Sequence, residues 1–330
     1  MDYKYLVCIS CPVYNHKPFI GMAMDGFCMQ KTNFPFVAVI VDDASTDGTC
    51  DVIKKYLEEN FIIGDGIDAC QKQTDYGSVF FLRNKNNPNC YFAVVFLQEN
   101  HYSHNKSKEV YREEWTRNSK YMAICEGDDY WIDPLKLKMQ VEYMESSPST
   151  GMCYTKCRYF YQDKMKFASK AWGGDAESFE RMIQSNPVPT ASALFRQELR
   201  NQYENEISPS SKGWMLGDYP FWIWIAKEYG VKFINEETCV YRVLEKSASH
   251  RDDKKKREEF IRSVCDIQIF FADKYHQSEL VRRDKAEMAL LMEAYSNKDY
   301  KAVVCLFHTI KKPSLKSIIK YLFSVLMLNV

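Results

Sequence analysis

Three carboxylates, Glu126, Asp128 and Asp129, follow an apolar segment at 121–125 that is typical of a buried strand. Two such charges about 4 Å apart repel by roughly 4 kcal/mol at an effective dielectric constant near 20. A folded chain therefore needs a cation to hold them together at a strand end. Carboxylate oxygens suit Mg²⁺ and Mn²⁺, and these ions bind phosphate oxygens in turn. A solvated acidic turn is the alternative explanation.

A second acidic pair, Asp42 and Asp43, follows the apolar segment at 36–41 and precedes a predicted helix at 48–60. A carboxylate at this position can accept a hydrogen bond from a base or a ribose, and the helix N-terminus attracts an anion. Asp47 is placed to act as the N-cap of the helix. An ordinary capped turn explains Asp47 in part, but it leaves the adjacent Asp42 and Asp43 unexplained.

The elements that must position these residues alternate along the first half of the chain. Apolar segments predict strands at 4–11, 36–41, 78–82 and 120–125. Capping residues and prolines predict helices at 18–31, 48–60 and 135–146. This order implies an α/β fold with a doubly wound, mostly parallel sheet, whose ligands bind beyond the carboxyl ends of the strands. All three polar motifs fall at those ends, at 12–16, 42–49 and 126–131.

The remaining segments are less regular. Residues 84–118 form a long polar connection, which we interpret as a partly helical insertion over the site. Beyond residue 150 the pattern is mixed, with predicted strands at 152–161 and 191–195 and a buried helix at 218–229. Further helices are predicted to the end of the chain.

Charge and cysteine usage exclude several classes of protein. The 44 basic residues balance 44 acidic ones, which argues against nucleic acid as a partner. Most of the twelve cysteines lie in apolar segments, where a free thiol behaves as a small hydrophobe. Cys8 and Cys11 have no second pair nearby, so a zinc ribbon is not expected. No signal peptide is recognisable at the start, and we therefore expect a cytoplasmic protein.

The segment 311–330 is apolar and contains four lysines, but it is too short to span a bilayer. Two interpretations stay open for it. It is either a helix that rests on the anionic inner face of the cell membrane or a terminal helix packed on the domain.

Three ordered motifs closely resemble the signature of glycosyltransferase family 2. They are Ile-Ser-Cys-Pro-Val-Tyr-Asn at 9–15, Val-Asp-Asp-Ala-Ser-Thr-Asp-Gly-Thr at 41–49, and Glu-Gly-Asp-Asp-Tyr-Trp-Ile-Asp-Pro at 126–134. Members have a Rossmann-like GT-A fold and are mostly bacterial sugar transferases. The resemblance covers roughly residues 4–250.

The resemblance implies a domain organisation for the whole chain. A GT-A nucleotide-sugar glycosyltransferase domain would occupy residues 1–250. Its nucleotide- and metal-binding half would be 1–135 and its acceptor half 136–250. A C-terminal helical region would follow at 251–330.

The resemblance also implies a donor site for a nucleotide sugar, most simply a UDP-sugar. The residues expected to contact this donor are Pro12, Val13, Tyr14, Asn15, Asp42, Asp43, Arg83 and Asp128. Asp43 would hold the nucleoside with Asp42 behind it, and Arg83 would approach the base. Asp128 and Asp129 resemble the family's Asp-x-Asp element, which binds Mn²⁺ or Mg²⁺ and the donor. Glu126 stands where many members carry the first Asp, which leaves open which carboxylate binds the metal.

Two later segments resemble the catalytic part of the family. Asp218 occupies the place of the base, although many members carry an acidic residue where this chain has Gly217. An N-cap for the helix that follows is the alternative role for Asp218. His250 lies in an element from which a histidine often reaches the metal or the diphosphate, but it equally fits a surface residue. Arg242 suits either a phosphate contact or a structural ion pair.

We therefore predict an inverting, metal-dependent glycosyltransferase that acts on a saccharide or lipid-linked saccharide. Synthesis of capsule, exopolysaccharide or lipopolysaccharide at the inner face of the cell membrane is the expected setting. A sugar nucleotidyltransferase is the alternative enzyme, but it needs a Gly-rich basic loop that 12–17 does not provide. A non-catalytic sugar-nucleotide-binding relative is the other alternative, suggested by Gly217 and Glu126. Retention of Asp128, Asp129 and Asp218 argues against it.

Overall fold

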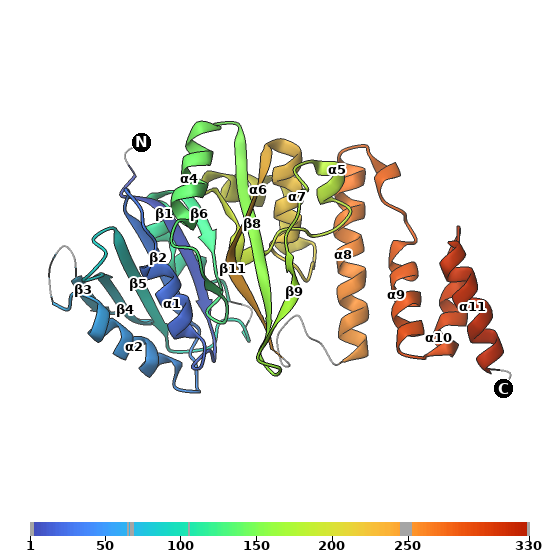
Figure 1. The fold of residues 1–330 in the computed structure, drawn as a ribbon, viewed down its shortest axis with the longest axis horizontal. Coiled ribbons are helices and arrows are strands. Elements are labelled where there is room, and N and C mark those ends of the chain that lie inside the picture. Colours follow the sequence, from blue (N-terminus) through green and yellow to red (C-terminus); the bar gives the residue numbers. More distant parts are fainter. Residues whose placement is uncertain (1–2, 65, 67–68, 105, 245–252, 329–330) are drawn as a thin grey trace. The chain divides into compact units, whose positions relative to one another are not determined.

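The computed structural model describes residues 3–64, 66, 69–104, 106–244 and 253–328 (Figure 1). The chain forms two compact units. The first comprises Met1–Ser178, Pro187–Ile207 and Ile225–Glu245. The second comprises Phe179–Asn186, Ser208–Trp224 and Lys246–Val330. Every strand of the described residues lies in the first unit, and the long C-terminal helices lie in the second.

Eleven strands form one sheet within the described part of the first unit. From one edge, their order is β3 (Ala69–Gln73), β4 (Gly77–Arg83), β5 (Cys90–Leu97), β2 (Phe36–Asp42), β1 (Tyr5–Val13), β6 (Ser119–Ile124), β10 (Leu194–Arg196), β8 (Thr150–Tyr161), β11 (Gly230–Val243) and β7 (Tyr130–Trp131). The remaining strand, β9 (Lys166–Trp172), pairs with β8. Strands β5, β2, β1 and β6 run parallel to one another, and β3, β4 and β10 run against their neighbours. The predicted α/β fold with a largely parallel central sheet is confirmed.

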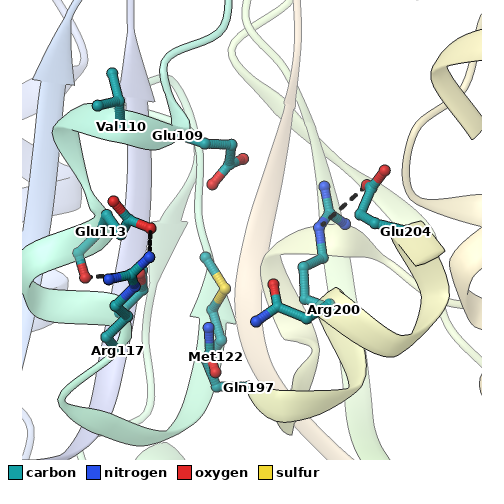
Figure 2. A pocket seen from close by; sticks show the side chains of 10 residues that line it. Glu109, Val110, Glu113, Arg117, Met122, Gln197, Arg200 and Glu204 are labelled. Atoms are coloured by element: carbon teal, nitrogen blue, oxygen red, sulfur yellow. Dashed lines mark hydrogen bonds and ion pairs between the residues drawn. The ribbon is translucent and has the colours of Figure 1, made fainter. Parts of the chain in front are cut away.

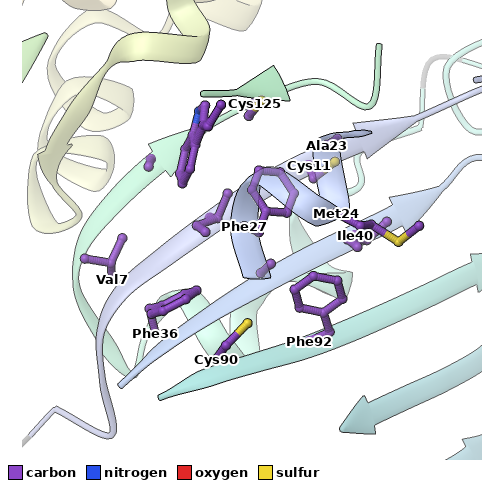
Figure 3. Close-up of a cluster of buried hydrophobic side chains, with 14 of the residues drawn as sticks. Val7, Cys11, Ala23, Met24, Phe27, Phe36, Ile40, Cys90, Phe92 and Cys125 are labelled. Carbon is purple, nitrogen blue, oxygen red and sulfur yellow. The ribbon is translucent and has the colours of Figure 1, made fainter. Parts of the chain in front are cut away.

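Apolar side chains cover both faces of the central strands, as their continuous hydrophobic sequences predict. On one face lie α1 (Ile20–Cys28), α2 (Thr49–Asn60) and α4 (Lys136–Ser146). Phe27 of α1 packs with Phe36 of β2 and Phe92 of β5 between this helix and the sheet (Figure 3). On the other face, Trp115 and Tyr111 pack on the sheet from α3 (Glu113–Thr116) and the short η1 (Glu109–Tyr111). The sheet is thus fully enclosed where it supports the polar motifs.

A glycine permits the close approach of α1 to β7. A Cβ atom on Gly26 would lie 2.9 Å from the backbone nitrogen and oxygen of Trp131. The Phe27 ring packs edge-on against the Trp131 indole, with ring centroids 5.1 Å apart. Trp131 is buried and donates from Nε1 to the Ala191 carbonyl at 2.8 Å, so it belongs to the core.

The interpretation of 84–118 as a polar insertion is wrong in part, because residues 90–97 form the buried strand β5. The apolar sequence of β5 is flanked by the polar segment 84–89, which obscured it. Strand β4 was predicted correctly as a strand, but it runs antiparallel to β5. Strands β3, β7, β9 and β11 were not predicted either.

The second unit is helical among its described residues. It contains α5 (Phe179–Met182), η3 (Pro209–Ser211), α8 (Lys254–Lys274), η4 (Ser278–Leu280), α9 (Lys285–Ser296), α10 (Tyr300–Phe307) and α11 (Leu315–Leu328). The helix α7 (Tyr219–Glu228) begins in this unit and ends in the first, which also holds η2 (Thr190–Ser192) and α6 (Glu198–Ile207). The Tyr219 hydroxyl donates to the Met182 carbonyl at 3.0 Å and accepts from Gln268 at 2.9 Å, which joins α5, α7 and α8. In the described segments we find no helix with both the length and the apolar character needed to cross a bilayer.

A buried lysine opens α4 in the first unit. The Lys136 ammonium donates to Gln140 Oε1 at 2.7 Å and lies 4.2 Å from the centroid of the Trp131 ring. Burial lowers the pKa of Lys136 from 10.5 to about 8. The folded state therefore releases this proton at a lower pH than the unfolded chain does.

The Lys136→Met variant is expected to lose a pH-dependent part of the stability. Between pH 8 and 10.5 the unfolded chain holds the proton and the folded chain does not, so wild-type stability rises with pH across this window. The 2.5-unit difference corresponds to about 3 kcal/mol. The free energy of unfolding in urea should rise between pH 7 and pH 10 by more for wild type than for the Lys136→Met variant. Lys138→Met, which replaces an exposed lysine on the same helix and keeps Lys136, should gain stability with pH as wild type does. An equal gain in Lys136→Met would contradict the assignment.

Candidate active site

The carboxyl ends of β1, β2 and β6 bring the three polar motifs together. The Pro12 carbonyl accepts a hydrogen bond from the Gly127 N–H at 3.1 Å, and the Val13 carbonyl accepts one from the Asp43 N–H at 2.9 Å. Pro12 and Val13 are the last residues of β1, whereas the sequence placed them in the loop that follows. The end of β1 therefore links the acidic pair after β2 to the acidic turn after β6.

Asn15 and Asp42 shape the loops on either side of this junction. Asn15 has a positive φ of 56°; its N–H donates to Ser45 Oγ at 2.8 Å, and its Oδ1 accepts from the Thr46 N–H at 2.8 Å. Asp42 is buried and accepts from the N–H and hydroxyl of Ser45 at 3.0 and 2.6 Å. Both side chains thus hold the loops, while the neighbouring Tyr14 is exposed.

The helix α2 does not begin as predicted. Gly48, with φ 90°, is the N-cap in place of Asp47. Asp47 accepts from the Thr49 N–H at 3.0 Å and from the Lys17 N–H at 3.0 Å. Asp47 therefore accepts a hydrogen bond from the first turn of α2, although it lies one residue before the N-cap. Its bond to Lys17 connects this turn to the loop after β1.

Asp43 is buried and already has three hydrogen-bond donors from one segment. Its Oδ1 accepts from the His101 N–H at 2.7 Å, and its Oδ2 accepts from the Tyr102 N–H at 3.1 Å and the Lys108 ammonium at 2.8 Å. Burial opposes ionisation of Asp43, but these hydrogen bonds outweigh it and hold the pKa of the carboxyl below its ordinary value. None of these three partners was predicted, because nothing in their sequence pattern points to Asp43.

His16 packs on the acidic turn and was not among the predicted site residues. Its Nε2 lies 3.9 Å from Asp128 Oδ1, and a Cβ on Gly127 would lie 2.8 Å from its Nδ1. Burial lowers the pKa of His16, although the carboxylates of Asp128, Asp47 and Asp42 act in the opposite direction. The only sequence signal for His16 was its position in the polar motif that follows the first strand.

Asp129 is a buried carboxyl among other acidic groups. Its Oδ1 accepts from the Arg242 backbone N–H at 2.8 Å. Burial raises the pKa of Asp129 well above its usual value, and the charges of Asp128 and Glu126 raise it further. The carboxyl thus lies where a nearby cation would favour its ionised form.

The Arg242 side chain donates hydrogen bonds to other groups of the protein. Nε donates to the Asp128 carbonyl at 2.8 Å, and Nη1 donates to Gln162 Oε1 at 2.5 Å. The guanidinium lies 4.7 Å from the centroid of the Phe19 ring and 5.2 Å from that of Tyr130. These contacts fit the structural role that the sequence left open for Arg242. The side chain connects β11 to the acidic turn.

The acidic turn fits a divalent ion that shares its coordination with a ligand. The described residues contain no group of three or more His, Cys, Asp or Glu side chains arranged to hold a metal. Mg²⁺ beside phosphates commonly uses one or two carboxylates and takes its other ligands from phosphate and water. Asp128 is partly exposed and Asp129 is buried with a raised pKa, which suits that kind of site better than a closed protein cage.

Arg83 does not lie at this edge of the sheet, so the expectation that it approaches the base is wrong. It ends β4 and pairs with Tyr91 near the start of β5, whereas Asp42 pairs with Phe96 near the end of β5. Five strand residues span about 17 Å. The error follows from the direction of β4, which is antiparallel and therefore ends at the opposite edge.

Asp218 belongs to the second unit, at the start of α7. Its Oδ1 accepts from the Tyr219 N–H at 2.7 Å, and its carbonyl accepts from the Trp222 N–H at 3.0 Å. Its role as a base therefore stays a prediction. His250 lies outside the described residues, and so does any contact it makes.

A separate hollow of about 370 Å³ lies on the first unit between η1, α3 and α6 (Figure 2). Ion pairs line it, Glu113 with Arg117 and Arg200 with Glu204. No residue of the three polar motifs contributes to its lining, so it is distinct from the junction of β1, β2 and β6.

Comparison with known sequences gives distant relatives. No protein-family model matches the chain. Uncharacterized proteins of Mycobacterium tuberculosis and Mycobacterium bovis are 32% identical over 188 residues, which is 56% of this chain and 45% of each relative. A Mycoplasma pneumoniae protein named as an uncharacterized glycosyltransferase is 25% identical over 133 residues, or 40% of this chain and 34% of that protein. The match thus spans less than half the length of these relatives.

Comparison with solved structures covers nearly the whole chain. The mannosyltransferase PcManGT from Pyrobaculum calidifontis, solved with GDP-Man and Mn²⁺, aligns with a TM-score of 0.55 over 99% of this chain and 81% of its own, at 15% identity. S. aureus TarS 1–349, solved with UDP-GlcNAc, aligns with a TM-score of 0.51 over 97% of this chain and 79% of its own, at 15% identity. The chain therefore has a glycosyltransferase-like fold.

Proposed function

We propose that this chain is an inverting glycosyltransferase that moves a sugar from a nucleotide-diphospho-sugar to a hydroxyl of a saccharide or lipid-linked saccharide. One observation carries the proposal. The ends of β1, β2 and β6 tie two acidic pairs to one edge of a glycosyltransferase-like sheet, through Pro12 to Gly127 and through Val13 to Asp43. The solved neighbours that share this fold bind UDP-GlcNAc or GDP-Man, which supports a nucleotide sugar as the donor.

Asp43 is the proposed nucleoside contact, with the residues 12–15 beside it. An ionised carboxylate has about four acceptor positions. The protein donors of Asp43 use three of them, which leaves capacity for one N–H of a base such as uracil. Because the Asp43 side chain is only 1% exposed, the segment that carries His101 and Lys108 has to move before a base can reach it.

Asp128, Asp129 and Glu126 are the proposed carboxylates of the metal and diphosphate site, with His250 as a further candidate ligand. A bound Mn²⁺ or Mg²⁺ would supply Lewis-acid stabilisation of the diphosphate that leaves. The Mn²⁺ present with the neighbouring mannosyltransferase supports a divalent cofactor. His16, whose Nε2 lies 3.9 Å from Asp128 Oδ1, would orient that carboxylate.

Asp218 is the proposed base. It would take the proton of the acceptor hydroxyl as its oxygen attacks the anomeric carbon, while the bond from that carbon to the diphosphate oxygen breaks. Attack from the face opposite the leaving group inverts the configuration of the sugar. The catalytic domain would span residues 1–250, so that it includes Asp218, and the helical region 251–330 would follow.

The proposed setting is synthesis of a cell-surface polysaccharide at the cytoplasmic side of the membrane. A metal-supplemented screen of sugar nucleotides tests the enzymatic assignment. With Mn²⁺ or Mg²⁺ and an acceptor mixture, we expect release of a nucleoside diphosphate from one donor class, and UDP is the expected product. Release of pyrophosphate from a nucleoside triphosphate would instead show a nucleotidyltransferase. Calorimetry without any metal-dependent sugar-nucleotide binding would instead favour a non-catalytic relative.

A further inference from the structure

The last helix of the second unit has its apolar side chains on the outside. Leu315, Ile319, Leu322 and Leu326 of α11 are 74, 58, 55 and 66% exposed. Their spacing of four, three and four residues places them on one face of the helix. A globular protein ordinarily buries such a face, so this one needs an apolar partner outside the described chain.

The opposite side of α11 carries hydroxyl groups. Ser317 and Ser324 are fully buried, and their hydroxyls donate to the carbonyls of Ser314 and Lys320 at 2.8 and 2.7 Å. These bonds satisfy the two serines locally, so they can pack within the unit without other polar partners. Tyr321 adds a ring that stacks on Phe307 of α10, with centroids 4.2 Å apart. The helix is therefore held by its small and aromatic side, and its leucine face stays outward.

The apolar cluster between α9 and α10 does not need the leucine face. Its buried members are Leu291, Ala294, Val303 and Ile310. Among the described residues, this cluster includes none from α11. Tyr321 and Phe323 of α11 reach Phe307 and Tyr295 at the margin of this cluster, and the fully buried positions of the helix are the serines. The sequence of α11 therefore places its apolar residues for a contact beyond this unit.

Positive charge lies beside the exposed leucine face. Residues 311–328 contain Lys311, Lys312, Lys316 and Lys320 and no acidic residue. The Lys320 ammonium lies 3.6 Å from the centroid of the Tyr295 ring of α9, so the outward charge is that of the exposed Lys311, Lys312 and Lys316. The turn before α11 is fixed, because the backbone N–H groups of Lys311 and Lys312 donate to Asp284 Oδ2 at 3.1 and 3.4 Å. Their side chains border a hollow of about 460 Å³ whose lining has four basic and two acidic side chains. An anionic surface would match this charge.

We propose that α11 docks the protein on an anionic membrane surface, with Leu315, Ile319, Leu322 and Leu326 in the acyl boundary and Lys311, Lys312 and Lys316 at the headgroups. At 1.5 Å per residue, 14 residues extend about 21 Å, which suits a helix lying in the interface and not one crossing it. A second copy of this chain fits less well, since it would cover the leucines but offer no surplus of negative charge to Lys311, Lys312 and Lys316, because the chain has 44 basic and 44 acidic residues. The proposal does not depend on the chemistry proposed for the first unit.

Vesicle sedimentation of the full chain tests the proposal. We expect the protein to bind vesicles of mixed phosphatidylglycerol and phosphatidylcholine. Its affinity should be lower by about tenfold or more for pure phosphatidylcholine vesicles and for the mixed vesicles at high salt. Ile319→Glu/Leu322→Glu should abolish binding, and Lys311→Glu/Lys312→Glu/Lys316→Glu should lower it about tenfold or more. Met165→Glu, which alters an exposed apolar residue in the β8–β9 turn, is the matched control and should bind as wild type does.

A second readout avoids dependence on charge-introducing variants. In the Leu322→Trp variant, the emission of the added tryptophan should shift to the blue when anionic vesicles are added. Brominated acyl chains should quench that emission. No shift and no sedimentation would overturn the proposal. Equal binding to neutral vesicles would overturn the role of the lysines. A wild-type dimer in sedimentation velocity that Ile319→Glu/Leu322→Glu converts to a monomer, without vesicle binding by either, would show that a second copy covers the helix.

Discussion

The Asp218→Asn variant is expected to lose sugar transfer, with kcat reduced by about 10²- to 10⁴-fold, the range of a lost general base. Asparagine keeps the oxygen that accepts from the Tyr219 N–H and is as good an N-cap as aspartate. Local helix structure and donor binding should therefore change little. Single-turnover transfer and calorimetric titration of the donor with Mn²⁺ measure the two effects separately.

Asp253→Asn is the matched control for this prediction. Asp253 is the N-cap of α8 in the same unit, and its Oδ1 accepts from the Lys255 N–H at 2.9 Å. If Asp218 served only as a cap, both variants would retain activity to the same extent. Transfer by Asp218→Asn at the wild-type rate would therefore remove Asp218 from the mechanism and leave the capping role alone.

The central strands were predictable because their sequences are continuously apolar. Strand β2 is buried at every position, and a continuous apolar run of this length is typical of a strand covered on both faces. The direction of β4 was not predictable from its own residues. Its pairing partner β5 was hidden beside an asparagine-rich segment, and without β5 the sequence favoured a parallel strand. The wrong placement of Arg83 is a direct consequence.

The acidic residues of the candidate site were predictable because adjacent like charges at a strand end are costly without a counter-ion. Their partners were not. Lys108 reaches Asp43 across 65 residues, from a segment with no helical or strand periodicity. His16 can pack on the acidic turn only because Gly127 has no side chain. The sequence alone does not show that these two residues are in contact. Sequence patterns thus located the charges but not the groups that hold them.

The division into units was also beyond the sequence. Segments Phe179–Asn186 and Ser208–Trp224 belong with the C-terminal helices, although they precede β11 of the sheet in the chain. The Tyr219 hydroxyl, in contact with the Met182 carbonyl and with Gln268, joins residues from three distant parts of the chain. Such a contact helps to hold the second unit together and has no local sequence signal.

The Asp129→Asn variant is expected to become more stable and at the same time inactive. Asp129 is a buried carboxyl beside Asp128 and Glu126, so a neutral side chain of the same shape removes a repulsion and keeps the acceptor for the Arg242 N–H. In metal-free buffer we expect the midpoint of thermal unfolding to rise by about 2–4 °C, or about 1 kcal/mol. Transfer should fall by about 10²-fold or more, because several kcal/mol of charge stabilisation depend on this carboxylate.

The response of the unfolding midpoint to Mn²⁺ and UDP tests whether Asp129 binds the metal, which a gain in stability alone does not. Mn²⁺ together with UDP should raise the unfolding midpoint of wild type, since a ligand that binds only the folded state stabilises it. The same addition should leave Asp129→Asn unchanged, and Asp163→Asn, an exposed aspartate of the same unit, should respond as wild type does. A wild-type response of Asp129→Asn to Mn²⁺ and UDP would show that Asp129 is not a metal ligand. A lower midpoint in metal-free buffer would show that the buried carboxylate stabilises the fold, contrary to the repulsion argued from its neighbours.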